Sequence, residues 1–81
     1  MRVRIRLFAR LREIAGAEEL EREVPAGSTL GAVWQALTDE FPAMAPYQRS
    51  VSGAVNADYA QLDAPVADGD EVAFLPPVSG G

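Results

Sequence analysis

The stretch DGDEVAFLPPVSGG, residues 68–81, contains a turn, a strand and a terminal tail. Asp68-Gly69-Asp70 indicates a turn, because glycine adopts positive φ freely and aspartate side chains hydrogen-bond to nearby backbone. Residues 71–75 alternate in polarity and predict a short strand. The proline pair that follows ends this strand, because proline fixes φ and has no backbone donor. We therefore expect a folded domain over residues 1–75 and a functional tail over residues 76–81.

The composition of the tail suggests what it does. A polyproline-like segment rises about 3.1 Å per residue, so six residues reach roughly 19 Å from the domain. Gly80 and Gly81 have no side chains and can enter a channel too narrow for other residues. A terminal carboxylate is ionised at neutral pH and is a poor electrophile. Chemistry at this carbon therefore requires activation, for example as an acyl adenylate.

The amino-acid composition excludes most kinds of catalytic site. The chain of 81 residues contains no cysteine, histidine or lysine. These absences exclude a thiolate nucleophile, a zinc–thiolate site, a histidine base and a Schiff-base lysine. A Ser-His-Asp triad cannot be built either. We expect a domain that is not an enzyme on its own, with no metal site and no bound cofactor.

Charge and hydropathy limit the partners that the chain could have. Twelve acidic residues against seven arginines give a net charge of −5, which disfavours nucleic acid and favours a partner with a basic pocket. No apolar run approaches the length of a membrane span. The basic N-terminal stretch lacks the apolar core and cleavage site of a signal peptide, so we expect a cytoplasmic protein without membrane contacts.

The periodicity of the first half predicts two strands and a main helix. Residues 2–8 and 19–24 alternate as strands that pair as an antiparallel hairpin, with a short helical turn over residues 9–15 between them. Ser28 or Thr29 can then cap a helix that ends at Phe41, because residues before proline avoid helical backbone.

The second half predicts short strands. We expect a loop with a short helical turn over residues 44–49, strands over residues 51–55 and 59–62, and a tight turn over residues 56–58. If the last strand, residues 71–75, lies parallel to the first, the connection is a right-handed crossover. One helix on one face of such a mixed sheet is an α+β architecture, the β-grasp or ubiquitin-like fold.

Three parts of the chain resemble the small subunit of molybdopterin synthase, a β-grasp sulfur carrier. They are FARLREIAG (residues 8–16), Val55-Asn56 and DGDEVAFLPPVSGG (residues 68–81). The resemblance implies that a ubiquitin-activating-like adenylyltransferase uses ATP to adenylate Gly81. A sulfurtransferase or cysteine desulfurase then supplies the sulfur of a C-terminal thiocarboxylate.

The resemblance also implies what the thiocarboxylate is for. The carrier inserts its tail into the large subunit of a heterotetrameric molybdopterin synthase. There it gives sulfur to a cyclic pyranopterin monophosphate, and the dithiolene of molybdopterin is built. Gly81 would carry the sulfur and Gly80 would permit threading, while the channel would be lined by Pro76, Pro77, Val78 and Ser79.

A partner surface follows from strand parity. If Val72 and Phe74 face the helix, Leu75 faces outward, and the same count places Phe8 outward on the neighbouring strand. Contiguous exposed apolar residues commonly mark a partner surface. Phe8 and Leu75 are therefore candidates for partner binding, and Arg12 and Tyr59 are candidates beside them.

Several alternatives remain open. The carrier chemistry could instead serve thiamine or tRNA thiolation, or the chain could be a ubiquitin-like protein modifier. Asp68-Gly69-Asp70 lacks the further ligands of a calcium loop and is better explained as a turn. Trp34 is expected in the core, and the three arginines of the first strand are expected to pair with acidic residues on neighbouring strands.

Overall fold

The first two strands pair around a short helix. The computed structural model describes residues 1–77, and in it β1 (Arg2–Leu7) and β2 (Glu19–Glu23) form the predicted antiparallel hairpin. The connection contains α1 (Ala9–Ala15), which ends at Gly16 with a left-handed φ of 75°. This is the conformation that glycine adopts most readily at the end of a helix.

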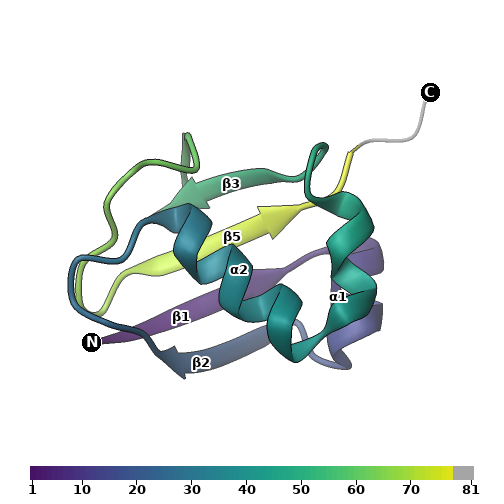
Figure 1. The fold of residues 1–81 in the computed structure, drawn as a ribbon, viewed down its shortest axis with the longest axis horizontal. Helices are drawn as coiled ribbons and strands as arrows, with labels where there is room; N and C mark the ends of the chain where they lie inside the picture. Colours follow the sequence, from purple (N-terminus) through teal and green to yellow (C-terminus); the bar gives the residue numbers. More distant parts are fainter. Residues whose placement is uncertain (78–81) are drawn as a thin grey trace.

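The main helix, α2 (Leu30–Glu40), has Thr29 as its N-cap and packs across one face of the sheet (Figure 1). The Thr29 hydroxyl accepts a hydrogen bond from the Ala32 amide at 3.1 Å, whereas the Ser28 hydroxyl donates to the Pro25 carbonyl. The N-cap is thus the second of the two predicted residues. After the helix, the short helical turn predicted within residues 44–49 is present as the 3-10 helix η1 (Pro42–Tyr47), which begins two residues earlier.

Three further strands complete a mixed sheet. They are β3 (Ser52–Val55), β4 (Asp58–Ala60) and β5 (Glu71–Leu75), and the strand order is β2-β1-β5-β3-β4. β5 lies parallel to β1 and antiparallel to β3, so the predicted β-grasp closure is confirmed (Figure 1).

The core lies between the sheet and α2. Its sheet side consists of Val3, Ile5, Leu7, Val72 and Phe74, and its helix side of Leu30, Val33, Trp34 and Leu37, all at most 1% exposed. The Trp34 and Phe74 rings meet with centroids 5.1 Å apart, and the indole nitrogen donates to the Gln48 side chain at 2.9 Å. Trp34 is therefore a core residue, as predicted.

Five strand boundaries differ from the prediction. β1 ends at Leu7, because Phe8 is the N-cap of α1, and β2 ends at Glu23. β3 begins at Ser52, because the Val51 amide donates to the Tyr47 carbonyl at the end of η1. β4 spans Asp58–Ala60, because the preceding turn uses only two residues and the chain leaves the sheet after Ala60. Within residues 1–77 no helix has the length and apolar character needed to cross a membrane.

Candidate functional site

The face of the sheet opposite α2 carries an apolar patch near the end of β5. Strand register aligns Ala73 with Ala54 and Ala54 with Tyr59, and it places Ser52 beside Leu75. Leu7 is aligned with Phe74 on the parallel neighbour, so Phe8 follows beside Leu75. We call Phe8, Leu75, Ala73, Ala54 and Tyr59 the apolar patch; within it Phe8 and Tyr59 are exposed, and Ala54 is only 7% exposed.

Phe8 is held outward by the junction between β1 and α1. Its backbone is extended, with φ −126° and ψ 152°, so the alternation of β1 continues for one residue beyond the strand. Ala9 then turns sharply with φ 51°, an uncommon value for a residue with a Cβ. The Phe8 side chain remains 39% exposed, and the Arg6 guanidinium lies 5.8 Å from its ring centroid. The predicted outward position of Phe8 is confirmed.

Tyr59 and Arg12 border this region in different ways. Tyr59 is 78% exposed and belongs to the outer face through its register with Ala54. Arg12 lies one turn into α1, and its guanidinium is 3.9 Å from the Glu18 carboxylate. Leu75 is half-buried at the end of β5. The patch thus brings Phe8 beside Leu75 and adds Tyr59, while a partner contact for Arg12 stays a prediction.

The other half of the same face is charged and internally paired. Arg2 lies 3.2 Å from Glu23, and Arg4 and Arg6 each lie 3.8 Å from Glu71. The predicted pairing of these three arginines with acidic neighbours is therefore confirmed. Exposed ion pairs of this kind add at most about 1 kcal/mol each. Their effect here is to separate a charged half of the face from the apolar patch.

The tail begins directly beside the apolar patch. Pro76 is half-buried and Pro77 is exposed, and neither belongs to a helix or strand. The remaining predicted tail residues, Val78, Ser79, Gly80 and Gly81, lie outside the described residues.

The turn before β5 is built from its aspartates, as predicted. Asp68 accepts the Arg2 amide at 2.7 Å, and Gly69 has a φ of 85°. Asp70 accepts the Ala67 amide at 2.8 Å and the Asn56 side-chain amide at 3.0 Å, and these two bonds lower the pKa of its carboxyl. Residues 1–77 contain no group of three acidic, histidine or cysteine side chains that could hold a metal ion.

Sequence reasoning missed two members of this surface. Ala54 was expected only as part of the strand over residues 51–55, and Arg6 only as one of the three arginines that pair with acidic neighbours. Parity along β3 could have placed Ala54 outward, but its alignment with Ala73 depends on the register between two distant strands. The position of Arg6 beside Phe8 follows from the alternation of β1, which continues through the extended backbone of Phe8, so parity could have indicated it.

Comparison with known proteins shows the family of this chain. The ThiS family model matches residues 5–81. The chain belongs to the ThiS family. ThiS-family relatives named molybdopterin synthase sulfur carrier subunit occur in Arabidopsis thaliana and Escherichia coli K12, and each is 37% identical to this chain. The alignments cover 98% of this chain in both cases, and 82% and 99% of the respective relatives.

Solved structures share the fold over the whole chain. SAMP1 from Haloferax volcanii has a TM-score of 0.85 at 32% identity, with 100% of both chains covered. Subunit 1 of the molybdopterin-converting factor from Helicobacter pylori, solved in a complex with subunit 2, has a TM-score of 0.69 at 26% identity, again with full coverage. The β-grasp assignment and the family resemblance are both confirmed.

Proposed function

We propose that this chain is the sulfur-carrier small subunit of a molybdopterin synthase. The observation that carries the proposal is the 37% identity to the Escherichia coli carrier subunit, aligned over 98% of this chain and 99% of the relative. Composition supports a carrier rather than an enzyme, because the chain contains no cysteine, histidine or lysine. Catalysis would reside in the large subunit, which would also supply the cationic groups that this acidic chain lacks.

The proposed reaction takes place at the carboxyl group of Gly81. In the first step a carboxylate oxygen attacks the α-phosphorus of ATP, pyrophosphate leaves, and an acyl adenylate forms on the adenylyltransferase. A sulfur nucleophile from a sulfurtransferase or cysteine desulfurase then displaces AMP. Reductive release of the sulfur from its donor by a thiol leaves the thiocarboxylate on Gly81. The sulfur finally passes to a cyclic pyranopterin monophosphate held by the large subunit.

The apolar patch is proposed as the surface on which the large subunit docks. Phe8 and Leu75 lie beside the root of the tail, so a partner that covers them is in position to receive residues 76–81. The relative from Helicobacter pylori was solved as a complex of subunits 1 and 2, which supports a stable partner of this kind. Phe8 is 39% exposed, so covering the rest of its side chain contributes less than the roughly 1.5–3 kcal/mol of a complete burial.

A second candidate function is that of a small protein modifier. It is favoured by the likeness to SAMP1, a modifier protein by name, with a TM-score of 0.85. The same activated Gly81 would then be joined to lysines of other proteins. Because the chain has no lysine, such a modifier could not extend itself through internal lysines.

Sulfur transfer in a reconstituted system tests the proposal and separates the two functions. Purified large subunit, a cyclic pyranopterin and thiocarboxylated carrier are expected to yield molybdopterin, and Gly81-deleted carrier is expected to yield none while remaining folded. Transfer retained without Gly81 would contradict the carrier mechanism. An isopeptide ladder in cell extract, with no molybdopterin formed in vitro, would favour the modifier.

A further inference from the structure

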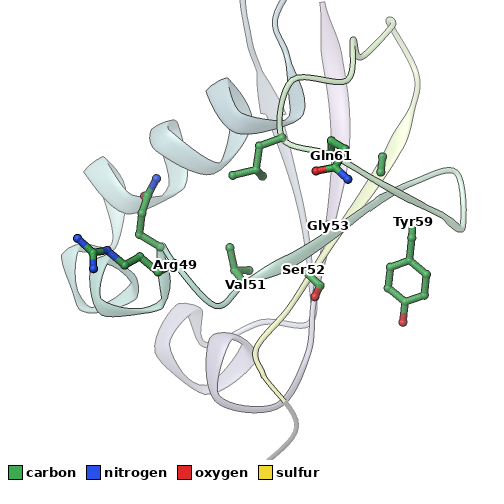
Figure 2. A pocket seen from close by; sticks show the side chains of 9 residues that line it. Arg49, Val51, Ser52, Gly53, Tyr59 and Gln61 are labelled. Carbon is green, nitrogen blue, oxygen red and sulfur yellow. The ribbon is translucent and has the colours of Figure 1, made fainter.

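A notch opens beside β4, where the sheet is interrupted. β4 ends at Ala60, and the chain then turns away: the Gln61 carbonyl accepts the Ala64 amide, and the Leu62 carbonyl accepts the Gly31 amide of α2. Ser52, the first residue of β3, is therefore left without a partner residue on β4. The resulting depression encloses about 450 Å³ and is flanked by Val51 and Gln61 (Figure 2).

The outer edge of β4, beside the notch, offers backbone groups suited to an extended segment. The β3–β4 hairpin has a two-residue turn, Asn56 and Ala57, with φ values of 50° and 73°. Such a turn closes on a hydrogen-bonded pair, so the next pair, Ala54 and Tyr59, is a non-hydrogen-bonded one. The backbone N–H and C=O of Tyr59 therefore point away from β3, toward the open edge. Added strands bind through groups of this kind.

Charge distinguishes this notch from the rest of the molecule. The chain carries a net charge of −5, yet no carboxylate lines the notch, and its one charged residue is Arg49. Six arginines form ion pairs with carboxylates among the described residues, and Arg49 forms none within residues 1–77. Arg49 and Gln61 lie on opposite sides of the opening, and the Arg49 guanidinium extends away from it (Figure 2).

We propose that the notch binds an extended acidic segment of the large subunit, with Arg49 pairing with a carboxylate of that segment. A guanidinium binds a carboxylate through two parallel hydrogen bonds, which favours this partner over a neutral one. Tyr59 lines the notch and also belongs to the apolar patch, so one partner can cover both. The identity of the partner rests on the proposed function, whereas the preference for an acidic strand rests on the notch itself.

The affinity of charge variants for purified large subunit tests this proposal. Arg49→Glu is expected to raise the Kd at least about tenfold, and Arg49→Lys to raise it by less, because lysine keeps the charge without the planar fork. Arg2→Glu is the control, since it makes the same change of net charge on β1, which β5 and β3 separate from β4; unlike Arg49, Arg2 is paired with a carboxylate, that of Glu23. We expect this control to change the Kd by less than about twofold. Thermal unfolding of each variant checks that the fold is retained.

A photo-crosslinking residue at position 61 identifies the occupant. We expect it to capture a peptide of the large subunit that contains aspartate or glutamate, and expect the same residue at position 2 to capture none. A crosslink to a second copy of this chain, or to a large-subunit peptide without acidic residues, would overturn the proposal.

The same affinity measurements distinguish failure of the notch proposal from failure of the proposed function. If wild-type protein and Arg49→Glu bind equally well and Phe8→Asp binds poorly, the docking surface stands and the notch proposal is overturned. If wild-type protein does not bind the large subunit at all, the proposed function fails, and the notch loses its assigned partner with it.

Discussion

Positive φ values at non-glycine residues indicate where tertiary structure, rather than local preference, determines the backbone conformation. Asn56 and Ala57 form the turn between β3 and β4, and Ala9 forms the bend after Phe8. The left-handed conformation at Asn56 could be predicted, because asparagine tolerates it. The positive φ values of Ala9 and Ala57 could not be predicted, because alanine has no such preference. That of Ala57 follows from the pairing of Val55 with Asp58 on either side of the turn.

Replacing Ala57 with glycine is expected to stabilise the domain. A left-handed alanine costs about 1–2 kcal/mol, and glycine costs about 0.5–1 kcal/mol in additional unfolded-state entropy. The net gain is about 0.5–1 kcal/mol, or a rise of a few degrees in Tm. Thermal unfolding followed by circular dichroism measures it. Ala60→Gly is the matched control in β4, where φ is not positive, and should lower the Tm. A lower Tm for Ala57→Gly would contradict this account of the turn.

Asp70 is expected to make stability depend on pH. Hydrogen bonds from the Ala67 amide and the Asn56 side chain lower its folded-state pKa below the ordinary value of 3.8. The stabilisation is therefore present above the unfolded pKa and is lost as the pH falls through the folded pKa. Asp70→Asn should have a free energy of unfolding about 1 kcal/mol lower than that of wild type at neutral pH.

The same comparison at acidic pH tests the cause. The difference between wild type and Asp70→Asn in urea unfolding should shrink toward zero as the pH falls through the folded-state pKa of Asp70, because both side chains are then neutral. A difference that does not change with pH would mean that the shape of the new side chain, rather than the ionisation of Asp70, accounts for the loss of stability.

At the scale of elements, type and order could be predicted, and boundaries could not. Alternation identified β1 and β2, and the spacing of Leu30, Val33, Trp34 and Leu37 identified α2. The early end of β4 depends on hydrogen bonds from residues 30 and 31 to residues 64 and 62, which bring together segments distant in sequence. For that reason the notch and Arg49 gave no signal in the sequence, although the apolar patch followed from parity.

Gly53 fixes how closely β3 approaches α2. A Cβ at this position would lie 2.6 Å from Cδ2 and 3.3 Å from Cγ of Leu30, a side chain that is 0% exposed. Gly53→Val should therefore lower the free energy of unfolding by about 1–3 kcal/mol, the usual cost of overpacking. Ser52→Val, one residue earlier on the opposite face, is the control and should change it by less than about 0.5 kcal/mol. Equal effects in urea unfolding would show that Leu30 moves aside freely.

At the scale of the whole molecule, the apolar patch is expected to govern binding rather than folding. Phe8→Asp places a charge on the surface beside Leu75, so it should raise the Kd for the large subunit by about tenfold or more with little change in Tm. Ala32→Asp adds the same charge on the exposed face of α2 and should bind as wild type does. If Phe8→Asp unfolds the domain instead, Phe8 serves the core and the patch is not a docking surface.

The whole fold serves, in this account, to present one carboxyl group to successive partners. The parallel closure of β5 on β1 directs the chain out of the sheet at Leu75, next to the patch that a partner would cover. The folded domain of residues 1–75 and the role of Gly81 remain proposals that rest on family membership and composition.

The intact mass of the protein, purified from cells that also express its activating enzyme and sulfur donor, tests the central claim most directly. We predict a species heavier than the unmodified chain by the difference between one sulfur and one oxygen atom. This species should be absent from Gly81-deleted protein made in the same cells. If the activating enzyme is shown to be active and the wild-type mass is unchanged, the chain is not a thiocarboxylate carrier.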